Sequence, residues 1–170
     1  MMARAKKMSE PGHFHRYLER FMGTWSYEFQ LFSGGVPSVP DKGTTEVSWL
    51  IPNRWIQSKD KGELMGQAYE GVMVMGYDNF KQSFVTTYVS NVDTTMQSTR
   101  GRLAPEGNSL VTYGVVDDVM TGKQDKMMKY IWRFESAVKR SLEIHDLSLP
   151  DGTTKVVEIR YSKQVAGGGK

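Results

Sequence analysis

The chain has 170 residues, a usual length for one domain and long enough to enclose a hydrophobic core. Apolar residues make up 39% and charged residues 24%, and no apolar run reaches the roughly 18 to 20 residues of a membrane helix. The chain contains no cysteine, which excludes disulfides and thiolate metal sites. The net charge of +3 comes from dispersed basic residues mixed with acids, so we expect neither a nucleic-acid partner nor a membrane partner.

The two ends of the chain carry no apolar pattern. Residues 1–8 include a basic patch with no apolar stretch behind it, so no secretory signal is evident and we expect a cytoplasmic protein. We expect residues 1–8 and 164–170 to be loose tails. Residues 9–163 are then a single domain.

One short helix is predicted at the start of that domain. Ser9, Glu10 and Pro11 supply a capping residue, an acid and a proline in a helix-opening order. An apolar stripe follows at spacings of three and four residues, formed by Phe14, Tyr17, Leu18 and Phe21, and Gly23 can end the helix.

The rest of the chain alternates apolar and polar residues with a period of two. Trp25, Tyr27, Phe29 and Leu31 begin this pattern, which is typical of strands with one buried face. Turn signals rich in glycine, proline and Asx residues recur along the chain and predict roughly ten antiparallel strands joined as hairpins. Closing such a sheet into an up-and-down barrel removes its edges, and a barrel of this width should enclose a cavity. A two-sheet sandwich is the alternative.

Short motifs add a family resemblance. The run from Phe21 through Gly23 to Trp25, a helix followed by Gly-x-Trp, resembles the lipocalin or calycin signature. In such barrels the tryptophan closes one end beneath the helix and a basic residue of the last strand packs across it, a role that the resemblance gives to Arg160. Together with Gly76-Tyr77-Asp78, the pattern resembles the bacterial family called domain of unknown function 1579. This resemblance implies a lipocalin-like fold and says little about chemistry.

Aromatic and methionine residues on the expected strands are the candidate ligand contacts. They suit an irregular apolar ligand, although they could simply fill the interior. Arg100 shares a strand face with Met96; pointing inward it could pair with a ligand carboxylate, and pointing outward it would be an ordinary surface arginine. The predicted ligand-binding residues are Trp49, Trp55, Met73, Met75, Tyr88, Met96, Arg100, Tyr130 and Trp132.

The histidines do not form a metal site. His13 and His15 are two residues apart and face different sides of a helix, and no other ligand spacing suits a metal. The nitrobindins, a neighbouring barrel family, bind haem through a histidine near the C-terminus, and His145 lies at a comparable place. The glycine-rich opening of that family is missing here, so no cofactor is predicted and haem stays a minor alternative.

Three functions remain open. The first is the binding of a small, largely apolar molecule in the barrel cavity. The second is a cofactor-independent enzyme of isomerase, cyclase or lyase type that uses the same cavity and lacks a recognisable catalytic motif. A titratable residue with a displaced pKa inside the cavity would favour the enzyme. The residues that could play that part are Glu46, Glu70, Glu143, Asp146 and His145.

The third is a protein-interaction barrel with no ligand. The strand around residues 67–78 is apolar on both faces, because Val72 and Val74 alternate with Met73 and Met75. A strand of this kind is buried on both sides, which predicts a homodimer contact near Val72 and Val74.

Overall fold

The computed structural model describes residues 2–119, 121–147 and 153–164. The predicted turn at residues 150–152 lies outside these ranges, as does the C-terminal tail apart from Gln164. The strands are β1 (Gly23–Ser33), β2 (Val36–Pro37), β3 (Asp41–Ile51), β4 (Trp55–Leu64), β5 (Gln67–Asp78), β6 (Ser83–Ser90), β7 (Gln97–Leu103), β8 (Ser109–Asp118), β9 (Lys123–Phe134), β10 (Lys139–Asp146) and β11 (Thr154–Lys163).

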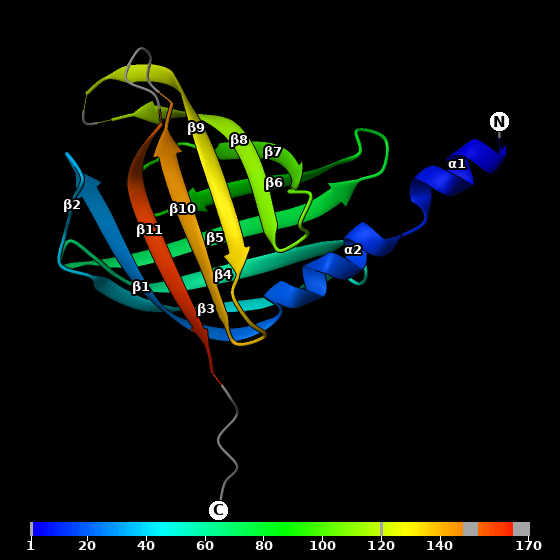
Figure 1. Cartoon of the computed structure of the whole chain (residues 1–170), viewed down its shortest axis with the longest axis horizontal. Coiled ribbons are helices and arrows are strands. Elements are labelled where there is room, and N and C mark those ends of the chain that lie inside the picture. Colours follow the sequence, from blue (N-terminus) through cyan, green and yellow to red (C-terminus); the bar gives the residue numbers. More distant parts are fainter. Residues whose placement is uncertain (1, 120, 148–152, 165–170) are drawn as a thin grey trace, which may run out of the picture.

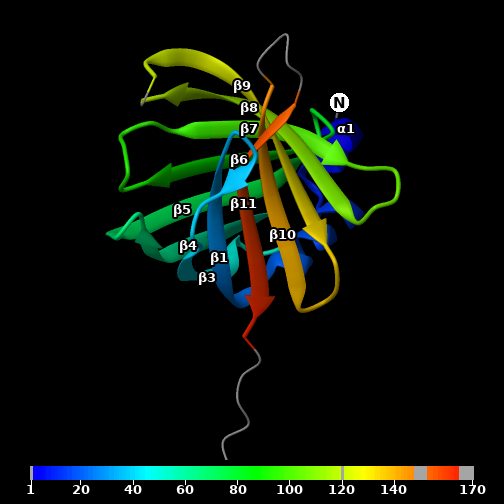
Figure 2. The same ribbon diagram turned by 60° about the vertical axis from the view of Figure 1, so that its left-hand side comes forward.

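The strands close into a barrel. From β3 to β11 each strand pairs antiparallel with the next along the chain, β1 pairs with β3, and β11 pairs back onto β1 (Figure 1). Figure 2 shows β11 between β10 and β1, where the ring closes. The two-residue β2 adds only to the end of β1. The prediction of a ten-stranded up-and-down barrel is confirmed, and the sandwich alternative is wrong.

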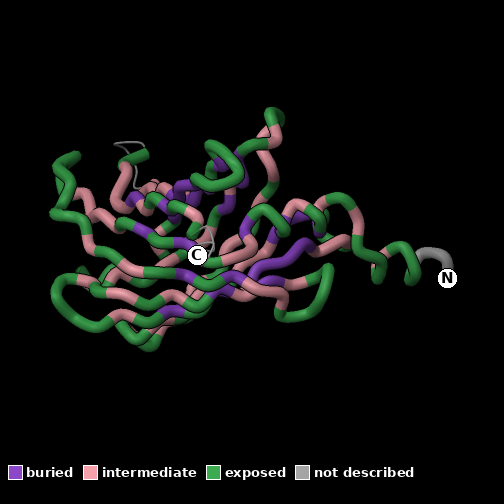
Figure 3. The backbone as a smooth tube through the Cα atoms, turned by 90° about the horizontal axis from the view of Figure 1, so that it is seen from below, coloured by how far each residue is buried: buried purple, intermediate pink, exposed green. Residues whose placement is uncertain are grey.

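Alternation along the strands sorts side chains between the interior and the outer surface. In β1, Trp25 and Tyr27 are buried whereas Ser26 between them is exposed, as the period of two requires. Buried and exposed segments alternate in the same way along other strands (Figure 3). The core therefore lies inside the barrel, and it includes Leu18 and Phe21 from the helical segment that precedes β1.

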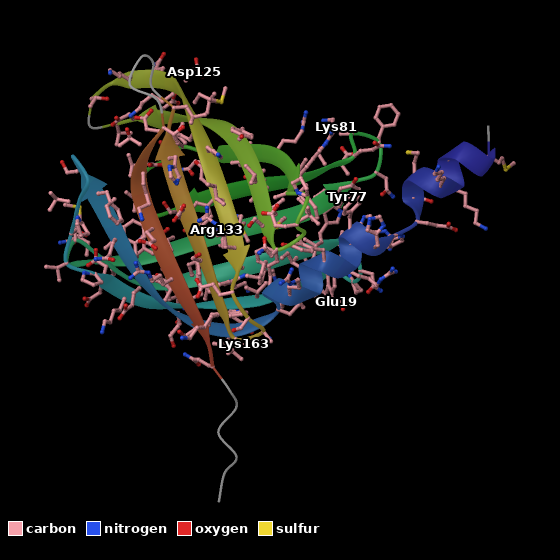
Figure 4. All side chains as sticks on the ribbon, in the orientation of Figure 1. Glu19, Tyr77, Lys81, Asp125, Arg133 and Lys163 are labelled. Carbon is pink, nitrogen blue, oxygen red and sulfur yellow. The ribbon has the colours of Figure 1, made fainter. Side chains whose placement is uncertain are left out.

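Two short helical segments cover one end of the barrel. Helix α2 (His13–Tyr17) continues into the 3-10 helix η1 (Leu18–Phe21), and both Leu18 and Phe21 have no exposed surface. The predicted stripe is confirmed, but α2 begins at His13 rather than at the predicted Ser9 cap. There the Gly12 N–H donates to Nδ1 of the buried His15 at 2.9 Å. Figure 4 labels Tyr77 beside α2, where it stacks on Phe14 with ring centres 4.5 Å apart.

The N-terminal segment differs from the expectation of a loose tail. Helix α1 (Met2–Ser9) extends away from the barrel (Figure 1). Its last turn is bound to the barrel, because Asn79 donates to the Met8 carbonyl at 3.1 Å and Arg54 donates to the Ser9 carbonyl at 3.1 Å. These contacts come from distant loops, which is why the local pattern does not predict them. Among the helices of the described residues, none has the length and apolar content needed to cross a bilayer.

Candidate functional site

The barrel encloses a cavity of about 280 Å³. Its lining includes Val92, which is 56% exposed, so the cavity reaches the surface at the end near the loop after β6. At the opposite end, the lining residue Trp132 packs edge-on against Phe21 of η1, with ring centres 5.4 Å apart. The cavity is thus a pocket closed by the helices and open at the far rim.

Tyrosine side chains form much of the wall. Glycines on neighbouring strands make room for two of them, because a Cβ at Gly43 would meet the Tyr27 ring and a Cβ at Gly71 would meet the Tyr88 hydroxyl. Such rings offer an apolar face together with one polar atom. The tyrosines of the lining are Tyr27, Tyr69, Tyr88, Tyr130 and Tyr161. Burial raises the pKa of each of them, that of Tyr130 to about 12, so the phenols are neutral at physiological pH.

One carboxyl group, that of Asp60, lies among these tyrosines. The Tyr88 hydroxyl donates to Asp60 Oδ2 at 3.2 Å, and the hydroxyls of Tyr88 and Tyr69 contact each other. Burial raises the pKa of Asp60, although hydrogen bonds and the charge of Arg140 oppose this effect in part. Asp60 is not predicted from the sequence, since it stands between Lys59 and Lys61 in what looks like a solvated run. Its phase with the buried Ile56 and Ser58 is the signal that could have found it.

A guanidinium occupies the closed end of the cavity. Arg140 is only 2% exposed and lies against four aromatic rings, with its Cζ 4.5 Å from the centres of Trp25 and Tyr161, 5.0 Å from Phe21 and 5.5 Å from Trp132. Burial lowers the pKa of Arg140 to about 10, so it keeps its charge at neutral pH. Its Nε and Nη1 are buried and have no hydrogen-bond partner among the described residues. Arg140 is also absent from the sequence-based candidates, because it follows Lys139 beside a turn.

The assignment of Arg160 to the indole of Trp25 is wrong. Arg160 lies between the inward-facing Ile159 and Tyr161, so it points outward and forms two hydrogen bonds with Glu158, at 3.1 and 3.0 Å. Lys163 at the end of β11 is the last-strand base that reaches the indole, with its Nζ 5.2 Å from the ring centre. Figure 4 labels Lys163 at that end of the barrel.

The structure divides the predicted ligand-binding residues into three groups. Met73, Tyr88, Tyr130 and Trp132 line the cavity. Trp49 and Met75 pack in the core outside the lining, on the inner face shared with Ile56. The remaining three do not face the interior.

Trp55, Met96 and Arg100 lie on the outside of the barrel. Trp55 covers Gly76, where its ring occupies the place of a Cβ, and Met96 is 69% exposed. Arg100 is exposed and lines a surface groove with Arg102. On β7 the odd-numbered residues Gln97 and Thr99 face the cavity. Arg100 is even-numbered and therefore points to the outer face.

None of the titratable residues singled out from the sequence lines the cavity; these are Glu46, Glu70, Glu143, Asp146 and His145. Arg133, labelled on β9 in Figure 4, binds Glu143 at 2.8 Å, and His145 Nε2 lies 3.1 Å from the same carboxylate oxygen. With Ile144 facing inward, His145 lies on the outer face of β10. Among the described residues, no group of three or more histidine, aspartate or glutamate side chains is placed to hold a metal ion.

These features define a class: a closed, lipocalin-like β-barrel with an interior cavity and one end covered by a short helix. The family model described as "Protein of unknown function (DUF1579)" matches residues 10–163, and the chain belongs to this family. The resemblance drawn from Gly-x-Trp and Gly-Tyr-Asp is therefore confirmed. A comparison with curated protein sequences gives no match.

Solved structures share the fold at low sequence identity. Rv2717c from M. tuberculosis superposes with a TM-score of 0.67 and 7% identity, over 92% of this chain and 100% of that one. The S-type phycobiliprotein lyase CPES from Guillardia theta has a TM-score of 0.58 and 9% identity, over 89% of this chain and 93% of that one. At such identities the likeness concerns the fold alone.

Proposed function

We propose that the protein binds a small, largely apolar molecule in the barrel cavity. The observation that carries this proposal is the cavity itself, which has a volume of about 280 Å³ and opens at one rim. Small-molecule sites are typically apolar concavities of roughly 300 to 1,000 Å³ with a few polar groups, so this cavity suits a ligand at the small end of that range. The shared fold of a phycobiliprotein lyase is compatible with ligand binding.

The lining supports an apolar ligand with limited polarity. Met73, Leu142 and Ile159 contribute aliphatic and thioether surface, and the tyrosine rings add flat apolar faces. The lining also carries hydroxyl groups, among them those of Thr45, Ser58 and Thr112, and the groups beside the tyrosines that can carry a charge include Asp60 and Arg140. A ligand would therefore gain most of its affinity from apolar contact and its orientation from those two groups.

Blocking the cavity tests this proposal. Purified protein is incubated with bacterial extract, and retained compounds are identified by native mass spectrometry. Thr86 lines the cavity and Thr87, the next residue of β6, is exposed, so Thr86→Trp fills the cavity while Thr87→Trp serves as the matched control. We expect a retained compound in the wild type and in T87W, and its loss in T86W. Equal retention in both variants, or none in the wild type, contradicts ligand binding in the cavity.

Asp60 favours a second candidate, a cofactor-independent isomerase, cyclase or lyase. A carboxyl group with a raised pKa beside a phenol in a cavity is the arrangement expected of a general acid or base. The test is to incubate the retained compound with wild-type protein and with Asp60→Asn. If the wild type converts the compound and D60N does not, the protein is an enzyme. If both return the compound unchanged, the result supports binding without catalysis.

The homodimer contact stays a prediction. Val72 is 40% exposed on the outer face and pairs across the sheet with Val89, which is 39% exposed, while Val74 is half-buried. Light scattering at high concentration tests it, and a monomer would contradict it.

A further inference from the structure

The buried guanidinium of Arg140 lacks the partners that a buried charge requires. In the described structure it forms no ion pair, and its Nε and Nη1 have no acceptor. The surrounding rings stabilise the cation through their faces, but a ring face satisfies N–H groups poorly. A buried cation with open donors is costly unless an acceptor completes it.

The carboxyl groups that line the cavity form no ion pair with Arg140. Asp60 attracts it electrostatically, yet the two side chains are not within ion-pair distance and Asp60 accepts instead from Tyr88. Asp93 lies at the rim and accepts from the backbone and hydroxyl of Thr95 at 2.8 and 2.7 Å. Arg140 thus lines the cavity without an acceptor for its Nε and Nη1 among the described residues.

We propose that Arg140 binds the head group of the ligand, and that this head group is a carboxylate. The planar guanidinium matches a carboxylate in shape and charge, and the aromatic setting excludes water from the pair. The apolar body of the ligand extends from there along Tyr130, Leu142 and Ile159 towards the open rim. This inference rests on the proposed function and adds the chemical class of the ligand, an amphipathic carboxylic acid.

The burial of Asp60 is compatible with an anionic guest. An ionised Asp60 would repel a carboxylate, but its raised pKa shifts it towards the neutral form, and Tyr88 donates to it. The other ionisable groups facing Asp60 in the cavity are Arg140 and the neutral phenols of Tyr27, Tyr69 and Tyr161. Arg140 thus supplies the one fixed charge at the closed end among the described lining residues.

Matched probes of one chain length test the charge preference in the wild-type protein. Binding of decanoate, 1-decanol and decylamine is measured by isothermal titration calorimetry at pH 7.5. Because a hydrogen-bonded charge pair contributes more than a neutral one, we expect decanoate to bind about tenfold or more tightly than decanol, and decylamine to bind weakest. Equal or tighter binding of decanol overturns the inference while leaving the proposed function intact. Binding of none of the three overturns both.

Variants then assign the preference to Arg140. We expect Arg140→Gln to bind decanol as the wild type does and to lose its preference for decanoate, and Arg140→Lys to keep part of that preference. Arg160→Gln removes an exposed arginine and should change nothing, so it is the matched control. Circular dichroism checks that each variant is folded. If R140Q does not fold, the ratio of decanoate to decanol affinity in the wild type and in R140K still tests the inference. A decanoate preference that survives unchanged in a folded R140Q overturns it.

Discussion

The guanidinium of Arg140 lies 4.5 Å from the centre of the Trp25 indole, inside the end of the barrel that the helices cover. The indole Nε1 in turn donates to the Phe21 backbone carbonyl at 2.8 Å. Trp25 therefore joins three parts of the molecule: η1 through its hydrogen bond, β1 through its backbone, and β10 through the cation on its face. Closure of the barrel end and the charge within the cavity depend on the same ring.

Replacing Trp25 should destabilise the fold strongly. Trp25→Phe removes a fully buried hydrogen bond to Phe21 and leaves space beside Arg140, so we expect a loss of about 2 to 4 kcal/mol in the free energy of unfolding. Urea denaturation followed by circular dichroism measures it. Trp55→Phe, on the half-buried outer face, is the control and should cost less. Similar losses in the two variants would show that Trp25 has no special role in closure.

A methyl group at Gly101 should strain the barrel wall. Its Cβ would meet the Val111 carbonyl and the Thr112 Cα, which are backbone atoms and cannot rotate away. We expect Gly101→Ala to lower the free energy of unfolding by about 1 to 3 kcal/mol or more. Ser98→Ala, an exposed position on the same strand, provides the comparison in urea denaturation. If both variants keep wild-type stability, β7 and β8 are not as close as the structure shows.

The raised pKa of Asp60 predicts that the stability of the fold depends on pH. An acid whose pKa is higher in the folded state than its unfolded value of about 3.9 binds its proton more tightly when folded. Below about pH 4 the shifted pKa of Asp60 does not change the free energy of unfolding. As the pH rises through the folded pKa, the shift lowers the free energy of unfolding. Asp60→Asn should therefore gain stability relative to the wild type at pH 7.5 but not at pH 4, as measured by thermal unfolding. Glu70→Gln, an exposed carboxylate, should show no such difference.

Lys126, at the open rim, should make the protein more stable at neutral pH than at acidic pH, which is the opposite pH dependence to that of Asp60. Its Nζ lies 3.0 Å from Asp118 Oδ2 and 2.9 Å from Asp146 Oδ2, and its hydrogen bond lowers the pKa of Asp118. Stability from a depressed carboxyl pKa is present above the unfolded value of about 3.9 and is lost as the pH falls towards the folded value. Lys126→Met should thus be destabilising at pH 7 and much less so at pH 3 in thermal unfolding.

Lys123→Met, on the same strand and exposed, is the control for this prediction. An equal loss of stability at both pH values in K126M would mean that the aliphatic part of Lys126, rather than its charge, holds the strands together.

The sequence by itself determined the strand pattern and the covered end. Each hairpin is a local event, so alternation and turn residues are sufficient to predict antiparallel neighbours in chain order. The apolar stripe from Phe14 to Phe21 and the tryptophan after Gly23 are equally local. For this reason the up-and-down order, the helix and the family resemblance are predicted correctly, whereas helix α1 is not, because its contacts come from the loops of Arg54 and Asn79.

Only the tertiary structure decided which side chains face the cavity. A shift of one residue moves a side chain to the opposite face of a strand, and a charged residue beside other charged residues is expected in solvent even where its phase agrees with buried neighbours. Arg100, whose orientation the sequence leaves open, and Arg160, which the family resemblance assigns to the indole, lie outside, while Asp60 and Arg140 look like surface residues in the sequence and lie within. Ring closure joins β11 to β1, and that long-range pairing sets the width of the barrel, its cavity and the groups that meet in it.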